Sequence, residues 1–255
     1  MSPGPREWEA DTYDRISAPH RRWGDDVLFR LRTGPAMSVL DAGCGTGRIT
    51  EALIARLGDV GSDGSRVTAV DGSAAMLDEF RARIGDRHGV TTVRADLTEP
   101  LEPVVGGPFD AVVSTATFHW IADHRALFAN LATVTGPGSQ LVAQFGGAGN
   151  CARFREAFAR VCPDAVEPWC FPDVAETEQA LQGAGFEPDA VWLEDDPVPF
   201  DDPQVLADYI RTIMIGWYMD GVPGEQQRPL TERIMAAMDT PVIDYVRINV
   251  VAHRV

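Results

Sequence analysis

The feature that most constrains this chain is a short glycine-rich segment that follows an apolar run. Residues 39–47 are V-L-D-A-G-C-G-T-G, an acid (Asp41) followed by three glycines spaced two apart: Gly43, Gly45 and Gly47. Residues 48–57 then carry apolar side chains at helical spacing. This order predicts a buried strand, a tight turn and a helix whose first N–H groups are unpaired. The pattern is typical of a nucleotide-binding loop in a doubly wound α/β sheet.

The spacing and the acids argue against a dinucleotide ligand. The dinucleotide fingerprint G-x-G-x-x-G needs a third glycine where this chain has Arg48. Asp41, at the end of the strand, would repel a pyrophosphate and stabilise a cationic ligand. Asp71 ends the next predicted strand, 66–70, where a carboxylate can accept hydrogen bonds from both hydroxyls of a ribose. We therefore expect a ligand that combines a positive charge with a ribose.

Together these residues resemble the class I, Rossmann-like methyltransferases that use S-adenosyl-L-methionine. The resemblance implies that the glycine loop surrounds the methionine end of this cofactor and that Asp71 binds its ribose. It also implies that Asp96, after the third strand, accepts from the adenine amine; a turn-capping role for this acid is an open alternative. The other cofactor-binding residues that we expect are Tyr13, Asp41, Gly72, Met76, Leu97 and Thr115.

The rest of the chain alternates strands with helices, as a doubly wound sheet requires. Further strands are predicted at 90–95, 109–116 and 140–145, and helices at 73–84 and 124–133. Residues 245–255 alternate apolar and polar side chains, which predicts a last strand, antiparallel and inserted into the sheet. The expected fold class is α/β: a Rossmann-like, doubly wound, mostly parallel seven-stranded sheet with an antiparallel last strand and a helical cap over its carboxyl edge.

Beyond residue 146 the spacing becomes mainly helical. Helices are predicted at 152–161, 174–181, 202–217 and 225–238, and an extended segment at 190–200. We expect the helices at 202–238 to form the cap, because they lie between the last two strands. The whole chain, 1–255, is then one domain with three special parts: an N-terminal helical wall (1–32), cap elements within 146–240, and the last strand within 241–255.

Composition and net charge limit the classes of molecule that this chain is expected to bind. A formal charge of −16 on 255 residues opposes attraction to nucleic acid or to an anionic membrane. The four cysteines show no C-x-x-C spacing, so neither a metal site nor a disulfide framework is indicated. We expect reduced thiols, a cytoplasmic protein and a small-molecule substrate. No apolar stretch approaches membrane-spanning length, and the sequence does not indicate an oligomeric state.

The chemistry of the methyl acceptor decides which side chains are needed. A carboxylate is ionised at neutral pH and needs no base, whereas a phenol or an amine usually has to lose a proton. His119 and Trp120 follow the fourth predicted strand, and His20 and His124 are further candidates. Packing in the core is an equally open role for His119.

A closer resemblance concerns the acceptor. Tyr13, the run His20-Arg21-Arg22, the pair His119-Trp120 and the ending 245–254 resemble the small-molecule carboxyl methyltransferases, above all the trans-aconitate methyltransferase-like group. The resemblance implies a small carboxylic acid as substrate, with His20 and Trp120 holding its carboxylate. This family usually has glutamine at the position of His20. Histidine can also act as a base, so the catalytic candidates are His20, His119 and Trp120.

Two alternatives remain at this stage. The enzyme could methylate oxygen, nitrogen or carbon of a natural-product intermediate with His20 or His119 as base. The chain could also bind the cofactor without transferring methyl, as a cyclase-like or regulatory protein. Arg211 and Arg247 are the positive groups that a polycarboxylate could use, although most arginines on such elements are solvated.

Overall fold

The computed structural model describes residue 7 and residues 18–255 except 59 and 63. A seven-stranded sheet has the order β3-β2-β1-β4-β5-β9-β6. Its strands are β1 (Ser38–Ala42), β2 (Arg66–Asp71), β3 (Val90–Arg94), β4 (Phe109–Thr115), β5 (Thr135–Gly146), β6 (Phe186–Asp195) and β9 (Val246–Arg254). Neighbouring strands from β1 to β5 pair in parallel, and β9 lies antiparallel between β5 and β6. The predicted fold class, including the inserted last strand, is confirmed.

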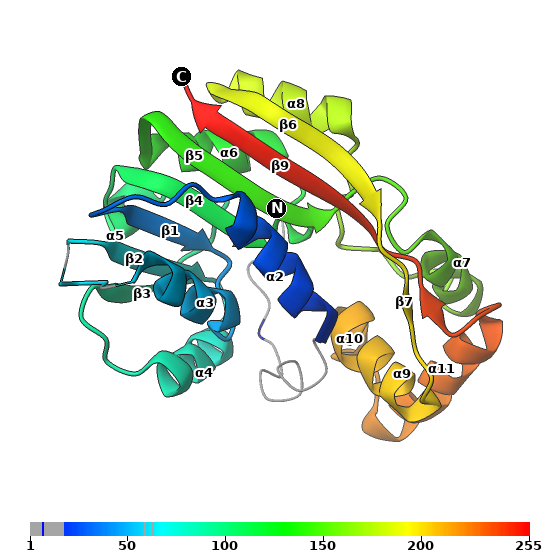
Figure 1. Cartoon of the computed structure of the whole chain (residues 1–255). Helices are drawn as coiled ribbons and strands as arrows, with labels where there is room; N and C mark the ends of the chain where they lie inside the picture. Colours follow the sequence, from blue (N-terminus) through cyan, green and yellow to red (C-terminus); the bar gives the residue numbers. More distant parts are fainter. Residues whose placement is uncertain (1–6, 8–17, 59, 63) are drawn as a thin grey trace.

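Helices cover both faces of the sheet (Figure 1). Along β1, Val39 belongs to a core cluster that includes residues of α2 (Ala18–Arg30) and α3 (Arg48–Leu57). Its neighbour Leu40 belongs to the cluster that includes residues of α6 (His124–Thr133) and α8 (Val174–Gly183). This alternation follows from the strand period of two. The remaining helices of the two layers are α4 (Ala74–Ile84) and the short α5 (Glu102–Val105).

Local signals fix where the helices begin. Ser73 caps α4 by accepting from the N–H of Met76, and Asp123 caps α6 in the same way. Asp173 and Glu176 form a reciprocal capping box at the start of α8. The predicted boundaries of α3 and α6 are confirmed. Strand β5 starts earlier than predicted because Thr135 pairs with Phe109 across a register shift, which keeps the following glycine–proline turn beside the sheet.

A second group of helices packs beyond the sheet; we name it the helical cluster. It consists of α7 (Ala152–Val161), α9 (Pro203–Tyr209), the π-helix η2 (Ile210–Met214), α10 (Gly216–Met219) and α11 (Gly224–Ala237) (Figure 1). Two short antiparallel strands, β7 (Val198–Pro199) and β8 (Val242–Ile243), bring the ends of segment 200–241 together. The prediction of one regular helix over 202–217 is wrong. The branched side chains of Ile210, Thr212 and Ile213 crowd an α-helix, and the chain leaves helical geometry at Ile215.

Helix α2 connects the sheet with the helical cluster. Val27, Leu28 and Leu31 pack on the sheet, whereas Trp23 is buried among residues of the cluster. The ring of Trp23 meets the ring of Tyr245 edge to face at 5.0 Å. Residues 8–17 of the predicted N-terminal wall lie outside the described residues. In the part of the chain that is described, no helix has the length and apolar character that crossing a membrane requires.

The inserted position of β9 can be tested by truncating its core. Ile248 is fully buried on the face that packs toward α6 and α8. We expect Ile248→Ala to lower the free energy of unfolding by about 2–5 kcal/mol, the usual cost of a large-to-small core substitution. Urea denaturation measures this loss. Val205→Ala on the exposed side of α9 is the control and should stay within about 0.5 kcal/mol. Equal effects of the two substitutions would contradict the packing of β9.

Candidate functional site

The carboxyl ends of the five parallel strands meet at one edge of the sheet, where open α/β sheets bind ligands. Four connections lie along this edge: residues 43–47 after β1, 71–73 after β2, 95–98 after β3 and 116–120 after β4. Seven of the eleven predicted cofactor-binding residues fall in these connections: Gly43, Gly45, Gly47, Asp71, Gly72, Asp96 and Leu97. The topology therefore brings them together, and the side chains decide what the edge can bind.

The glycine loop is tied to β2 by its backbone. The N–H groups of Gly43 and Cys44 both donate to the carbonyl of Val70, at 2.8 and 2.9 Å. Gly43, Gly45 and Gly47 have left-handed φ angles of 85°, 53° and 84°. A Cβ on Gly43 would lie 2.2 Å from the side chain of Thr117, and one on Gly47 would lie 2.7 Å from Phe80. A Cβ on Gly45 would meet no described atom within 4 Å, so the loop leaves open space there.

Asp71 joins the glycine loop to helix α4. One carboxylate oxygen accepts from the N–H of Gly45 and the other from the N–H of Ser73, both at 2.9 Å. Burial raises the pKa of Asp71, and these backbone hydrogen bonds oppose the rise. The half-buried carboxylate thus lies at the edge, next to the open space at Gly45, as a ribose-binding role requires.

A second carboxylate, which the sequence analysis did not single out, lies at the start of α4. Glu7 accepts from the hydroxyl of Ser73 at 2.8 Å and from the N–H groups of Ala74 and Ala75 at 3.2 Å. It also pairs with Arg94 at 2.8 Å. The hydrogen bond from Ser73 is the main reason why the pKa of Glu7 is lowered. Glu7 therefore lies at this edge of the sheet, next to Asp71.

Asp41 lies beneath the loop, not on its surface. Its side chain is only 2% exposed and accepts a hydrogen bond of 2.6 Å from the hydroxyl of Thr50. Burial raises the pKa of Asp41 to about 7, although the hydrogen bond from Thr50 opposes the rise. Any effect of Asp41 on a ligand is consequently electrostatic, through the loop.

Asp96, predicted at the adenine, and the predicted cofactor-binding residues Gly72, Met76 and Leu97 lie in or next to the connections after β2 and β3. Met76 and Leu97 are buried, and the carbonyl of Gly72 accepts from Arg94 at 3.0 Å. One oxygen of Asp96 accepts from both the N–H and the hydroxyl of Thr98, at 2.9 and 2.7 Å. Asp96 therefore fills the turn-capping role that the sequence analysis left open.

At the end of β4 the chain turns back toward the glycine loop. The hydroxyl of Thr117 lies 3.2 Å from the carbonyl of Gly43 and 3.1 Å from that of Thr115. The hydroxyl of Thr115 itself is buried without a hydrogen-bond partner among the described residues. An orphaned buried hydroxyl is uncommon and marks Thr115 as a group that can serve a ligand.

The pair His119-Trp120 lies in a short 3₁₀ helix, η1 (Phe118–Trp120). The Nδ1 atom of His119 accepts from the N–H of Gly146 at 3.4 Å, so a neutral ring carries its proton on Nε2. His119 is then a hydrogen-bond donor and not a base at that nitrogen. Trp120 is half-buried, and its ring lies 6.0 Å from that of Trp169.

The other candidates divide by location. His124 is buried and donates from Nε2 to the carbonyl of Phe118 at 2.9 Å, and burial lowers its pKa. It supports the His119-Trp120 turn from the core. His20 lies in α2, one turn before Trp23, but its side chain, like all of Tyr13, lies outside the described residues.

The two candidate arginines differ sharply. Arg211 is partly exposed and pairs with Asp208 on the same helical segment at 3.2 Å. Arg247 is 2% exposed at the start of β9. The sequence analysis missed Gln144 and Asn249, buried polar residues in otherwise apolar strands, whose side chains share a hydrogen bond of 2.8 Å. A polar residue inside an apolar run is the signal that could have found them.

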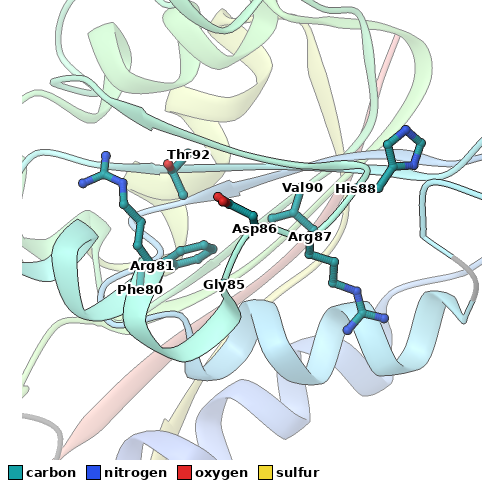
Figure 2. A pocket seen from close by; sticks show the side chains of 8 residues that line it. All are labelled: Phe80, Arg81, Gly85, Asp86, Arg87, His88, Val90 and Thr92. Atoms are coloured by element: carbon teal, nitrogen blue, oxygen red, sulfur yellow. The ribbon is translucent and has the colours of Figure 1, made fainter.

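A hollow of about 310 Å³ lies away from these residues (Figure 2). It is lined by the end of α4 and the start of β3, so it opens at the amino edge of the sheet, opposite the glycine loop. It plays no part in the candidate site. No cluster of His, Cys, Asp and Glu suited to a metal ion occurs within the described residues.

Sequence comparison relates part of the chain to known proteins. Residues 39–138 match the family described as "Methyltransferase domain". Trans-aconitate 2-methyltransferases from Acidovorax sp. (strain JS42) and Rhizobium meliloti (strain 1021) are 31% identical over 138 and 137 residues. Each alignment covers 54% of this chain and 49% of the relative. The chain thus spans about half the length of the curated relatives it matches.

Solved structures resemble the whole chain. A Bacillus halodurans C-125 protein assigned to the methyltransferases has a TM-score of 0.61 at 17% identity, with 90% of this chain and 97% of that chain covered. Phosphoethanolamine N-methyltransferase 2 of Haemonchus contortus has the same TM-score and identity, with 96% and 56% covered. At such identities the likeness shows the fold. The match to the methyltransferase family thus covers residues 39–138, and the whole chain has the class I methyltransferase fold.

The buried acid beneath the loop predicts a pH-dependent stability. Asp41 has a folded pKa of about 7 against an ordinary 3.8. Between these values the folded state binds a proton that the unfolded state releases, so this group stabilises the fold less as pH rises. Asp41→Asn should therefore gain stability relative to wild type, by about 1–3 kcal/mol more at about pH 8 than at about pH 5.

Urea denaturation of the ligand-free protein at the two pH values measures this difference. Asp201→Asn, at an exposed position, is the control and should shift both values equally. A pH-independent difference between Asp41→Asn and wild type would show that Asp41 does not titrate in this range.

Proposed function

We propose that this chain transfers methyl from S-adenosyl-L-methionine to a carboxylate oxygen of a small organic acid. The observation that carries the cofactor assignment is the Asp71 carboxylate, held by Gly45 and Ser73 beside open space at the glycine loop. The acceptor assignment is supported by relatives named trans-aconitate 2-methyltransferase.

The residues present fit this cofactor. A side chain at Gly45 would project into the open space, so a glycine there lets a ligand approach the backbone closely. Asp71 offers carboxylate oxygens to ribose hydroxyls, and Met76 and Leu97 offer apolar surface in the neighbouring connections. The bound cofactor supplies an electrophilic methyl group on a sulfonium. The negative charges of Asp41 and Asp71 are of the sign that stabilises such a cation.

The acceptor carboxylate needs alignment more than proton removal. It is ionised at neutral pH, so the protein has only to hold its oxygens and exclude water. Trp120 has an indole N–H, and the Nε2–H of His119 is a further donor because Nδ1 is engaged by Gly146. We expect His20 to complete the set from α2. The engaged Nδ1 atom favours this assignment over the alternative in which His119 acts as a base.

The direct test is product analysis. The protein is incubated with S-adenosyl-L-methionine and a panel of small acids, alcohols and amines, and mass spectrometry identifies the methylated product. A methyl ester supports the proposal. A methylated alcohol or amine identifies the base-assisted alternative, and cofactor binding without any product identifies a non-methylating protein.

The ribose assignment predicts a loss of cofactor affinity. Asp71→Asn removes the negative charge and part of the acceptor capacity while keeping the shape, and should weaken S-adenosyl-L-methionine binding by about 1–3 kcal/mol. Isothermal titration calorimetry measures this change. Asp78→Asn, at an exposed position on α4, is the control and should bind as wild type does. Unchanged affinity in Asp71→Asn would remove the ribose assignment.

The acceptor assignment predicts opposite outcomes for two roles of His20. If His20 donates to a carboxylate, His20→Gln should retain its rate, because glutamine donates as well. If it is a general base, the rate should fall by roughly 10²–10⁴-fold.

Trp120→Phe should lower acceptor affinity or turnover by about 1–3 kcal/mol and leave cofactor binding intact. Steady-state kinetics with the identified acid measure the effects of both substitutions. Trp192→Phe on β6 is the control and should behave as wild type does.

A further inference from the structure

Arg247 lies where the sheet, α2 and the helical cluster meet. As the second residue of β9 it is paired with Gly146 on β5 and Glu194 on β6. Gly146 is the last residue of β5, so Arg247 lies at the same edge of the sheet as the glycine loop. Its side chain is 2% exposed. A guanidinium placed there is a buried positive charge in a chain whose formal charge is −16.

The guanidinium of Arg247 has no acceptor for two of its nitrogens. Nε and Nη2 are buried without a hydrogen-bond partner among the described residues. The nearby acids are engaged elsewhere: Asp196 accepts from Arg22 and from the indole of Trp23, and Glu194 accepts from Asn249 at 3.4 Å. A buried charge whose hydrogen-bond donors are left unpaired is strongly unfavourable. Such a group persists most readily where function requires it.

Arg30 shows what a satisfied arginine looks like on the same face. Its guanidinium lies over the ring of Trp192, 4.7 Å from the centroid, and it donates to the side-chain oxygen of Asn249 at 2.8 Å. The guanidinium of Arg247 also lies over an aromatic ring, but its Nε and Nη2 atoms donate to no side chain of the described residues.

Aromatic rings support the charge of Arg247. The guanidinium carbon lies 4.0 Å from the ring centroid of Trp23 and 5.9 Å from that of Tyr245. Ring contacts engage the faces of a guanidinium and leave its N–H groups, which point outward in its plane, for an acceptor. Burial lowers the pKa of Arg247 to about 10, so the group is charged at neutral pH. The aromatic rings therefore stabilise the positive charge of Arg247 and leave its Nε and Nη2 donors available to an anionic ligand.

Two further buried polar atoms without hydrogen-bond partners among the described residues lie on the strands beside Arg247. Thr115 on β4 is paired with Gln144 on β5, which is paired with Asn249 on β9, two residues from Arg247. Because paired residues and residues two apart share a face, all four lie on the face covered by α2. The hydroxyl of Thr115 and the side-chain oxygen of Gln144 are buried without partners in the described part of the chain. The row thus offers a polar ligand hydrogen bonds at three strands.

We propose that Arg247 binds a carboxylate of the acceptor other than the one that is methylated, so that the substrate is at least a dicarboxylic acid. The inference rests on the proposed function for the nature of the acceptor. Two parallel N–H groups of a guanidinium pair with both oxygens of one carboxylate. A carboxylate held in this way is a weaker nucleophile, because both of its oxygens accept charge-assisted hydrogen bonds. This assigns Arg247 to the non-reacting group.

The position of Gly146 supports this division of roles. Its N–H donates to His119, and across the sheet it is paired with Arg247. Paired residues of neighbouring strands are roughly 5 Å apart. The turn that carries Trp120 and the arginine that binds the second carboxylate thus flank one short stretch of β5. The proposal therefore places the two carboxylates of one small acid on the two sides of this stretch.

Calorimetry with a matched pair of ligands tests the proposal. Fumarate and crotonate share the same four-carbon skeleton, and crotonate has a methyl group in place of one carboxylate. Each is titrated, alongside trans-aconitate, into wild type and variants in the presence of S-adenosylhomocysteine, which prevents turnover. We expect wild type to bind fumarate roughly 10- to 100-fold more tightly than crotonate.

Three variants locate the effect. Arg247→Met keeps an unbranched, flexible side chain and removes the unpaired charge, so it should fold with equal or greater stability and lose the preference for fumarate. Arg247→Lys keeps the charge without the planar fork and should retain only part of the preference. Arg30→Met, the matched control, removes a satisfied arginine on the same face and should keep the preference.

The outcomes separate this inference from the proposed function. A wild-type protein without a preference for fumarate, or an Arg247→Met variant that keeps it, overturns the role of Arg247. Failure of wild type to form a methyl ester from any acid overturns the proposed function, whereas the calorimetric preference is measured without turnover.

Discussion

The carboxylate of Asp71 is the interaction on which the site depends, because it accepts from Gly45 and Ser73 at once. These two hydrogen bonds fix the glycine loop, the end of β2 and the start of α4 relative to one another. They form only in one register of β1 with β2, in which Ala42 lies opposite Val70. A slip of one residue would turn Asp71 to the other face of the sheet. The order of the parallel strands thus sets the geometry of the loop.

Burying Asp41 and Asp71 at this edge is energetically unfavourable, and their raised pKa values show it. Burial raises the pKa of both Asp41 and Asp71, and the charge of Asp71 also raises the pKa of Asp41. Two buried carboxylates at one strand edge are unfavourable in the ligand-free protein. A cation bound above the loop would relieve that repulsion. Local rules are most often broken at functional sites, and these acids fit that pattern.

Sequence patterns predicted the elements whose signals are local. Helix 48–57 has strong apolar periodicity and a glycine before it, and its bounds are confirmed. The break at Ile215 and the early start of β5 depend on crowding and on pairing across the sheet, which periodicity does not contain. The candidate site divides in the same way. The edge position of Asp71 follows from strand order, whereas the burial of Asp41 and the capping role of Asp96 depend on tertiary packing.

Charged side chains of opposite sign lie toward the two ends of the carboxyl edge of the sheet. Asp41 and Asp71 lie at the ends of β1 and β2, and Arg247 lies three strand positions from β1, beyond β4 and β5. Under the proposed function, a cationic cofactor is favoured at the first end and an anionic acceptor at the second. The opposite placement would set like charges together at both ends. A chain with a formal charge of −16 repels small acids in general. A buried cation that packs against aromatic rings is then a direct way to select an anionic substrate at one point.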